Sequence, residues 1–414
     1  MINNNKKKKV LIVGAGFAGL RFFYDLTEKL SADVEVTVID ERTTSLEKPS
    51  LPEVALDGKQ VSLVQIELES IIRSRGARFV NKALVEIKPG ENTVVLSDGE
   101  SMSYDYLVVA TGAVKDYDAI PGYREFGYSV CDDVEAPKLW EALKSFKGGK
   151  IVIGSAKTDW SPETTDLRLA APCEGPIGEI LFMIDHYLRE KNLRGKSSIT
   201  VFSPGHIFFE DVGENVHSKI EPLLAERDIS VITDKVLKNI KADRVEFEDG
   251  TDLQSDFTIV IPPYTGTDVI KKSGIGDEFG FVRTDLEMRS MKFRNIFVAG
   301  DSNANSMPKL GHIAIMQADV AFSSLVKEIK GAGYIKEFKP EIFCIMNRGG
   351  SDATLILSDV LYGGTTDVTL DGSIARTMKW GFDSYYYYMR GRMPPEILQE
   401  PLERILKLVK EKGT

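Results

Sequence analysis

The chain has 414 residues, of which 43% are hydrophobic and 28% are charged, and its formal net charge is -10. This length is too great for one compact core, so we expect two or three domains of the soluble globular kind. The negative net charge argues against a nucleic-acid-binding protein, which normally presents a basic face. No apolar run approaches the roughly 18 residues that a membrane-spanning helix needs.

The N-terminus is a short basic tail, residues 1–9, that leads into an apolar segment. The tail lacks the apolar core and the small-residue cleavage site of a signal peptide, so we expect no signal peptide. The sequence contains three cysteines, too few and too scattered for a disulfide scaffold. Three thiols therefore need an explanation.

A glycine-rich turn follows the first predicted strand, residues 10–13. Gly14, Gly16 and Gly19 form a G-x-G-x-x-G pattern that leads into a helical pattern at residues 20–30. In a dinucleotide-binding domain the first glycine permits the tight turn, the second lets the backbone approach a pyrophosphate, and the third allows close helix–strand packing. The N-terminus of the following helix would face the phosphates with its free N–H groups.

A second predicted strand, residues 34–39, ends at two carboxylates. Asp40 lies 21 residues after Gly19, and Glu41 follows it. Either of them would accept hydrogen bonds from a ribose. This strand–turn–helix–strand–acid order gives the full context of a dinucleotide-binding site.

Two later segments indicate which dinucleotide binds. Residues 104–112 form an apolar strand that ends in Thr111-Gly112, and residues 295–301 form another that ends in Gly300-Asp301. Both resemble signatures of two-dinucleotide-domain flavoproteins. In that group the Thr-Gly turn lies near the flavin, and the aspartate holds the ribityl and pyrophosphate part of FAD. With all three motifs in order, FAD is expected rather than NAD.

The chain also repeats itself. A predicted hairpin and strand at residues 93–112 recur at residues 244–264, and the two Asp-Gly turns lie 151 residues apart. The repeat predicts an α/β fold with two tandem Rossmann-like domains, the second inserted into the first. We expect a first FAD-binding part, a degenerate NAD-type domain, a second FAD-binding part and a C-terminal membrane-interaction region at residues 6–113, 114–284, 285–330 and 331–414.

The second domain opens with a damaged fingerprint. The strand at residues 150–154 is followed by Gly154-Ser-Ala-Lys-Thr-Asp159, with one glycine where three are wanted, and an irregular stretch at residues 160–172 replaces the immediate helix. Without the missing glycines a backbone approach to a nicotinamide dinucleotide is hindered. We therefore expect an electron donor smaller than NADH.

Cys131, Cys173 and Cys344 lie in three different segments, 42 and 171 residues apart. No C-x-x-C pair exists, so neither zinc ligation nor a thioredoxin-like dithiol is indicated, and no metal site is expected. Cys173 precedes a predicted helix at residues 177–189, whose dipole should favour its thiolate. The alternative is that all three thiols are inert core residues.

At this point the sequence resembles the sulfide:quinone oxidoreductases, in the version found in archaea, over essentially the whole chain. The resemblance rests on segments at residues 128–131, 173–179, 262–266, 307–311 and 343–344. It implies that Cys173 and Cys344 are the redox pair that collects sulfur, and that Cys131 lies near the flavin, to which it is bonded in some members. It implies that Lys309 adjoins the pyrimidine edge of the flavin and that Glu179 is an acid/base.

The motifs and the resemblance together define the expected FAD site, which comprises Gly14, Gly16, Phe17, Ala18, Gly19, Asp40, Glu41, Arg42, Leu84, Thr111, Gly112, Gly300, Asp301, Lys309, Leu310 and Gly311. One departure from the family is that bacterial members place histidines near the sulfide channel, which nothing here matches. We expect His186 and His206 to be structural or exposed.

The expected chemistry follows from sulfur and flavin reactivity. Sulfide attack on a cysteine disulfide or polysulfide is thiol–disulfide exchange with a small nucleophile. The flavin supplies the electron chemistry, and the protein supplies orientation and charge. We expect a cycle in which Cys173 and Cys344 carry sulfur while FAD carries electrons.

The C-terminal stretch, residues 376–414, should meet a lipid-soluble quinone. It holds the densest aromatic cluster in the chain, and Phe382, Tyr385 and Tyr386 are the candidates to stack on the quinone ring. The stretch contains eight Lys and Arg and five Asp and Glu, which gives it a local net charge of +3. A helical pattern of apolar residues spans residues 397–409. A basic amphipathic helix with aromatics is typical of a membrane surface. The alternative is a helix docked on the protein or at a dimer interface.

The expected partners are sulfide, a membrane quinone and a membrane surface, with a homo-oligomer as a further option, at the cytoplasmic face and without crossing the bilayer. Two rival enzymes remain: a type II NADH:quinone oxidoreductase and a flavocytochrome-type sulfide dehydrogenase. The damaged fingerprint argues against the first, and the lack of an export signal argues against the second. A non-enzyme rival is a flavin-binding regulatory protein with passive thiols.

Overall fold

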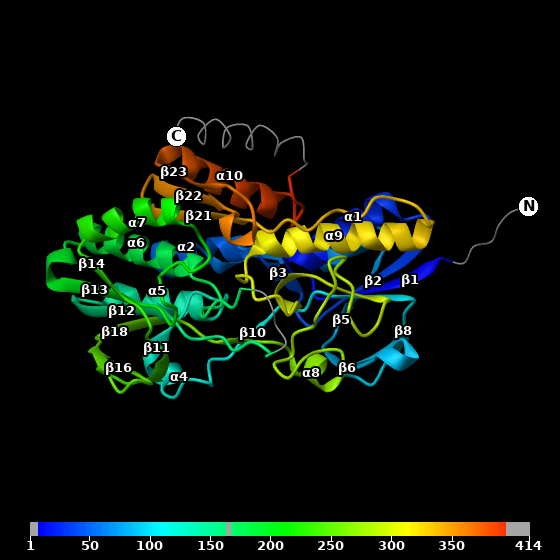
Figure 1. Ribbon diagram of the computed structural model, residues 1–414, viewed down its shortest axis with the longest axis horizontal. Helices are drawn as coiled ribbons and strands as arrows, with labels where there is room; N and C mark the ends of the chain where they lie inside the picture. The colour runs from blue at the N-terminus through cyan, green and yellow to red at the C-terminus, as the bar shows by residue number, and fades with distance from the viewer. Residues whose placement is uncertain (1–6, 163–166, 395–414) are drawn as a thin grey trace, which may run out of the picture.

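The computed structural model describes residues 7–162 and 167–394 (Figure 1). Two parallel five-stranded sheets lie side by side, each with helices on one face. A three-stranded antiparallel sheet and a helix, drawn in orange and red, lie over helices of both units. The architecture is therefore α/β with two Rossmann-like units, which confirms the predicted fold class.

The first sheet has the order β20–β9–β1–β2–β5, and all its pairings are parallel. Its strands are β1 (Lys8–Val13), β2 (Val34–Asp40), β5 (Arg78–Asn81), β9 (Tyr106–Val109) and β20 (Ile296–Val298). Helices α1 (Phe17–Lys29) and α9 (Gly311–Lys330) pack together over one face. Because β20 comes from far along the chain and pairs with β9, two separate segments build this unit, as the Gly300-Asp301 motif predicted.

The second sheet has the order β11–β18–β12–β13–β14 and is also parallel. Its strands are β11 (Gly127–Tyr128), β12 (Gly149–Ser155), β13 (Ser197–Phe202), β14 (Ile229–Ile232) and β18 (Phe257–Ile261). One face is covered by α5 (Glu135–Ser145), α6 (Gly175–Glu190) and α7 (Glu214–Glu226). The continuous apolar runs of β12 and β18 are buried on both faces, as parallel strands require.

The predicted internal repeat is confirmed by two antiparallel meanders. They are β6 (Leu84–Lys88), β7 (Thr93–Leu96) and β8 (Ser101–Ser103) in the first unit, and β15 (Leu237–Ile240), β16 (Arg244–Phe247) and β17 (Asp252–Gln254) in the second. Gly99 and Gly250 turn the two hairpins with φ of 86° and 84°. That left-handed conformation favours glycine, which explains the repeated Asp-Gly.

The C-terminal part is the antiparallel sheet β21 (Ile342–Gly349), β22 (Asp352–Ser358) and β23 (Asp367–Asp371), followed by α10 (Ser373–Tyr388). Strand β21 packs on α6 of the second unit and on α9 of the first, and α10 packs on β22 (Figure 1). This part therefore bridges the two units, along α6 and at the start of α9.

The remaining elements are short. They are α2 (Leu51–Asp57), α3 (Glu69–Ser74), α4 (Tyr123–Phe126), α8 (Asp268–Lys272), β3 (Thr44–Leu46), β4 (Gln65–Glu67), β10 (Val114–Lys115), β19 (Tyr264–Thr265) and the 3-10 turns η1 (Lys48–Ser50), η2 (Val61–Leu63), η3 (Pro89–Glu91), η4 (Arg194–Lys196), η5 (Gly300–Ser302) and η6 (Val360–Tyr362). Strands β10 and β19 pair where the chain passes between the two units. Within residues 7–162 and 167–394, every helix is too short or too polar to span a bilayer.

Candidate active site

The glycine-rich turn between β1 and α1 is tightly packed on one side and open on the other. Gly14 has φ of +94°, and a Cβ there would lie 2.2 Å from the carbonyl oxygen of Ala110. A Cβ at Gly19 would lie 1.9 Å from the carbonyl oxygen of Gly14. A Cβ at Gly16, in contrast, would meet nothing within 4 Å. The backbone is thus exposed to an incoming ligand at the N-terminus of α1, where N–H groups can bind phosphate.

The ends of β9 and β20 complete this side of the site. Thr111, just after β9, has a buried hydroxyl oxygen that has no hydrogen-bond partner among the described residues. Gly300 has φ of +79°, and a Cβ there would lie 3.2 Å from the Cβ of Ala18. The Asp301 turn and the α1 turn therefore adjoin each other. The open phosphate cradle, the orphaned hydroxyl and the adjacent carboxylate fit an FAD molecule.

Asp40 at the end of β2 holds the glycine turn itself. Its Oδ2 accepts the N–H of Ala15 at 2.7 Å, and its Oδ1 accepts the N–H of Arg42 at 2.9 Å. Burial raises the pKa of this carboxyl. Glu41 is exposed, and the Arg42 side chain pairs with Asp133 at 3.1 Å. Of the two ribose candidates, Asp40 has a structural role already, whereas Glu41 lies at the surface.

Lys309 connects the FAD side to the cysteine side. Its buried Nζ donates to the carbonyl oxygens of Asp301 at 3.0 Å and Asn303 at 2.9 Å. Its backbone N–H donates to the carbonyl oxygen of Pro172 at 3.0 Å, directly before Cys173. Burial lowers the pKa of Lys309 to about 8. A cation held by two carbonyls is therefore fixed between the Asp301 turn and the cysteine loop.

Cys173 and Cys344 converge although they are 171 residues apart in sequence. Cys173 lies in the loop before α6, and Cys344 lies on β21, which packs on that helix. A Cβ at Gly175, two residues after Cys173, would lie 3.3 Å from Cys344 Sγ. Both are free thiols, Cys173 buried and Cys344 half-buried. The structure thus brings together the two cysteines that the resemblance pairs.

The structure favours the protonated thiol of Cys173, not the thiolate that the sequence predicted. Burial raises the pKa of Cys173 well above its ordinary value, and the nearby carboxylate of Asp211 and the Cys344 sulfur raise it further. A hydrogen bond from the Gly175 N–H at the start of α6 lowers it, but by less. Burial also raises the pKa of Cys344, to about 12. The prediction from the helix dipole was wrong because desolvation of the thiolate outweighs the dipole.

A small acidic cavity adjoins Cys173. Its volume is about 10 Å³, roughly the space that one water molecule requires. It is lined by Leu169, Ala171, Cys173, Glu174, Glu210, Asp211 and Pro308. Burial raises the pKa of Glu174 to about 8 and that of Asp211 to about 6. Since a buried, acidic cavity disfavours anions, it suits a small neutral molecule.

Cys131 lies beside the crossover between the two units. It is buried, and the Tyr264 hydroxyl donates to its sulfur at 3.7 Å. Lys115 Nζ stands 4.8 Å from the centre of the Tyr264 ring. Burial raises the pKa of Cys131 and lowers that of Lys115 to about 8. The tyrosine and the lysine were not predicted from the sequence.

Glu179 is a buried residue of α6 rather than a helix-surface carboxylate. It is 6% exposed, and its Oε1 lies 3.3 Å from the Nζ of Lys379 on α10. Burial raises the pKa of Glu179 to about 7, although the nearby Lys379 lowers it. Its charge raises the pKa of Cys344. A carboxyl that titrates near neutrality therefore stands next to the cysteine pair.

The second fingerprint lacks the geometry of the first. Helix α6 begins only at residue 175, well after β12 ends at residue 155. A Cβ at Gly154 would lie 2.3 Å from the Phe202 ring, so this glycine is packed against a side chain instead of facing open space. Trp160 Nε1 donates to the carbonyl oxygen of Leu169 at 2.7 Å, which ties the connecting loop to itself. The helix that would bind a nicotinamide dinucleotide instead begins at Gly175, two residues after Cys173.

The aromatic residues of α10 lie on two sides. Tyr386 is buried and stacks on Phe17 of α1 with ring centres 4.6 Å apart, and Phe382 lies 6.2 Å from Tyr386. Tyr385 is half-buried, whereas Trp380 is 65% exposed. The quinone candidates thus extend from the surface to the glycine-rich turn. The predicted basic helix at residues 397–409 lies outside the described residues.

The remaining predicted FAD contacts come from three segments. Leu310 caps the N-terminus of α9, and a Cβ at Gly311 would lie 3.6 Å from the Phe17 ring. Gly112 has φ of +72° and open space around it, and Leu84 begins β6.

Several buried charged residues were not predicted from the sequence, namely Glu47, Glu174, Asp211, Lys379 and Asp383. Lys379 and Asp383 are four residues apart, a spacing that could have indicated an ion pair on one helix face. His206 is exposed and pairs with Asp234 at 2.9 Å, and His186 pairs with Glu190 at 3.3 Å. Both fit the prediction that these histidines are structural or exposed.

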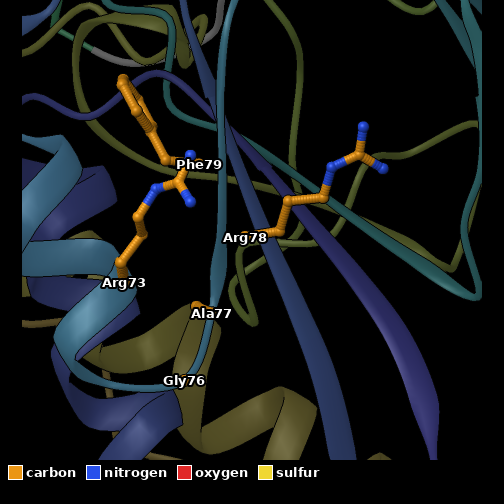
Figure 2. A pocket seen from close by; sticks show the side chains of 5 residues that line it. All are labelled: Arg73, Gly76, Ala77, Arg78 and Phe79. Atoms are coloured by element: carbon orange, nitrogen blue, oxygen red, sulfur yellow. The ribbon is translucent and has the colours of Figure 1, made fainter.

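A larger surface hollow of about 520 Å³ lies away from these residues (Figure 2). It is lined by Arg73, Gly76, Ala77, Arg78 and Phe79, and the figure shows Arg73 and Phe79 on one side of β5 with Arg78 on the other. Arg73 pairs with Glu69 at 2.7 Å, and Arg78 pairs with Glu100 at 3.0 Å. Its arginines are already neutralised, and it shares no residue with the cysteine or FAD sites.

The two Rossmann-like units carry one open phosphate cradle, at the glycine-rich turn of the first unit. Residues 8–158 match the family described as "Pyridine nucleotide-disulphide oxidoreductase". FAD, the cofactor of this family, fits the intact cradle described above.

Similar proteins indicate a more specific class of enzyme. The chain is 24% identical to a sulfide-quinone reductase of Aquifex aeolicus, over 97% of this chain and 96% of that one. It is 26% identical to a mitochondrial sulfide:quinone oxidoreductase of Dictyostelium discoideum, over 87% and 79% of the two chains. A solved structure of the Aquifex aeolicus sulfide:quinone oxidoreductase superposes with a TM-score of 0.87 at 24% identity, over 97% of this chain and 96% of that one. The chain is thus similar over most of its length to sulfide:quinone oxidoreductases; the archaeal version stays a prediction.

Proposed function

We propose that the chain oxidises sulfide at Cys173 and Cys344 and transfers the two electrons through FAD to a membrane quinone. The observation that carries the proposal is the convergence of these two thiols at the start of α6, where an NAD-type domain would bind its dinucleotide. The homology to sulfide:quinone oxidoreductases supports the same substrate and acceptor.

The acidic cavity selects the form of the substrate. Glu174, Glu210 and Asp211 line it together with Cys173. An anion such as HS⁻ would have to enter beside these carboxyl groups without its hydration, whereas neutral H₂S carries no charge to desolvate. The cavity therefore admits H₂S and excludes larger thiols.

The cysteine pair then carries the sulfur. Sulfide attacks a disulfide or bridging sulfur between Cys173 and Cys344, so that one new S–S bond forms and one cysteine sulfur leaves as a thiolate. Burial makes this thiolate costly, and Glu179 beside Cys344 lowers that cost when it accepts the proton released by sulfide, because its negative charge is then removed. When bound, FAD supplies the two-electron carrier between sulfur and quinone.

Other residues position the cofactor. Gly16 and the N-terminus of α1 would hold the pyrophosphate, and Asp301 would hold the ribityl part. Lys309 would place its cation near the ring, where it favours the negative charge of the reduced form. Cys131 with Tyr264 would lie on the flavin side of the crossover.

The quinone would enter along α10. Phe382, Tyr385 and Tyr386 would line its site, and the exposed Trp380 and Tyr388 would sit in the membrane interface, where amphipathic rings are favoured. We place the protein peripherally on the cytoplasmic face of the cell membrane on this basis and on the basic character of residues 376–414.

A steady-state assay tests the proposal. The purified enzyme should reduce decylubiquinone with sulfide as donor, and Cys344→Ala should lower the rate to background while its flavin absorbance is retained. Cys131→Ala serves as a comparison because it lies outside the pair. Full activity of Cys344→Ala would overturn the assignment, and oxidation of NADH at rates comparable with sulfide would favour the type II NADH:quinone oxidoreductase.

A further inference from the structure

A buried group of charged residues lies between the cysteine pair and the aromatic end of α10. We call it the α10 charge cluster, and it comprises Glu47, Glu53, Lys59, Glu179, Arg376, Lys379 and Asp383. Lys379 is at its centre: its Nζ lies 3.3 Å from Glu179 Oε1 and 3.9 Å from Asp383 Oδ2, and it donates to the carbonyl oxygen of Pro49 at 2.8 Å. Glu53 lies at the outer end, where it pairs with Lys59 at 3.0 Å and Arg376 at 2.9 Å.

Several buried oxygen atoms in and beside this cluster have no hydrogen bond among the described residues. Glu47 is 1% exposed and Asp383 is 6% exposed. Among the described residues, Glu47 Oε1, both carboxylate oxygens of Asp383 and the Tyr386 hydroxyl are buried without a hydrogen bond. Glu47 uses only its other oxygen, which accepts the Ser50 N–H at 3.2 Å. Native proteins rarely leave buried oxygens in this state, so protons or waters are expected among them.

The cluster also contains one carboxyl group too many. Its four carboxyl groups face three cations, Lys59, Arg376 and Lys379, and Glu53 already occupies the first two. Lys379 is therefore left with Glu47, Glu179 and Asp383. Lys379 Nζ also donates to the carbonyl oxygen of Pro49, two residues after Glu47, so the Glu47 turn lies against this ammonium group. With one cation among three buried carboxyl groups, not all of them can stay ionised, and a retained proton is the usual result.

The cluster lies between the proposed sites of sulfide oxidation and of quinone reduction. At one end Glu179 and Lys379 act electrostatically on Cys344. At the other end Asp383 is followed one turn later by Tyr386, whose ring stacks on Phe17 at the glycine-rich turn. Asp383, Lys379 and Lys59 act electrostatically on Glu47, and Glu47 and Tyr24 act electrostatically on Tyr386. Asp57 lies outside, near Arg376.

We propose that Glu47 and Asp383 share one proton and deliver it to the quinone at Tyr386, and that Glu179 refills the pair with a proton from the sulfide side. Lys379 is the positioning residue, since it holds Glu179 and Asp383 around one ammonium group. The inference rests on the proposed function.

The proton balance is simple. Oxidation of H₂S to bound sulfur releases two electrons and two protons, and reduction of a quinone to the quinol takes up two electrons and two protons. One of these protons passes from sulfide to Glu179 and then to the Glu47–Asp383 pair. The other exchanges with solvent. No further oxidant or reductant is required.

A rapid-mixing experiment tests the acceptor end. Enzyme reduced anaerobically with dithionite is mixed with decylubiquinone over a range of pH, so that no sulfide step is involved. Burial and the Asp383 charge raise the pKa of Glu47 to about 8. The wild-type reoxidation rate should therefore be constant below this pH and fall about tenfold per pH unit above it. Asp383→Asn should slow reoxidation at least about tenfold and remove this dependence, and Asp383→Glu should restore it.

Two further measurements keep the inference falsifiable. Asp319→Asn removes a half-buried carboxylate elsewhere, paired with Arg21 at 2.5 Å and Lys336 at 2.8 Å, and should leave the pH profile of reoxidation unchanged. A pH-difference infrared spectrum of the oxidised wild type should show a protonated carboxyl band that disappears on going to alkaline pH and is absent in Glu47→Gln. A wild-type profile that is flat with pH, or a carboxyl band unaffected by Glu47→Gln, would overturn the inference. Failure of sulfide to reduce the flavin would overturn the proposed function alone.

Discussion

Replacement of Lys379 by methionine should destabilise the protein in a pH-dependent way. The change keeps the length of the side chain but removes the cation next to Glu179 and Asp383, at 3.3 and 3.9 Å, and the hydrogen bond to Pro49. Removing one partner of a buried ion pair typically costs about 3–5 kcal/mol, because it leaves an uncompensated buried charge. One kcal/mol shifts Tm by about 2–4 °C for a domain of 150–250 residues, so a decrease of about 6–20 °C is expected.

The pH dependence has a definite sign. Lys379 lowers the pKa values of Glu47, Glu179 and Asp383, so its removal raises all three further above their ordinary values. A carboxyl with a raised pKa in the folded state loses stability as pH rises above its unfolded-state value. The Tm decrease of Lys379→Met should therefore be larger at pH 8 than at pH 5, where the carboxyls can take up protons.

Differential scanning calorimetry at the two pH values measures this effect. Lys330→Met is the matched control, because Lys330 pairs with Asp33 at the surface and its loss should cost at most about 1 kcal/mol at either pH. An equal decrease of Tm at pH 5 and pH 8, or a decrease no larger than that of the control, would refute the description of a buried charge cluster around Lys379.

Three further changes test other parts of the site. Gly16→Val places a side chain in the open part of the glycine turn, so the protein should fold but be purified with little flavin, as its visible absorbance would show. Glu179→Gln removes a carboxyl group whose pKa burial raises from 4.5 to about 7. The wild type should therefore lose stability between pH 4.5 and pH 7, and this loss should be smaller in the variant. Identical curves of Tm against pH for the two proteins would contradict this. Trp380→Ser together with Tyr388→Ser should weaken sedimentation with lipid vesicles, and unchanged sedimentation would argue that these exposed rings do not meet the membrane.

The fold could be predicted to a large extent because its signals are local. The glycine turn, the two Asp-Gly hairpins and the buried runs of β9 and β18 each define a short segment whose geometry depends on its own residues. The repeat then implied two similar units, and the Gly300-Asp301 motif implied the return to the first. The defective second fingerprint was predicted for the same reason.

The site could be predicted only where a motif marked it. Cys173 and Cys344 were paired by resemblance, since nothing in their own segments indicates that β21 packs on α6. The prediction of a thiolate at Cys173 was wrong because the sequence shows the start of a helix but not how deeply the thiol is buried. Lys379 and Asp383 were not predicted because Glu47 and Glu179 come from distant segments of the chain. Only the packing of these segments brings the four residues together.

The most direct test of the central claim is an anaerobic titration of the flavin. Sulfide added to the purified enzyme should bleach the flavin absorbance, and subsequent addition of decylubiquinone should restore it in full, with Cys344→Ala failing at the first step only. A flavin that NADH bleaches and sulfide does not would contradict the proposed function.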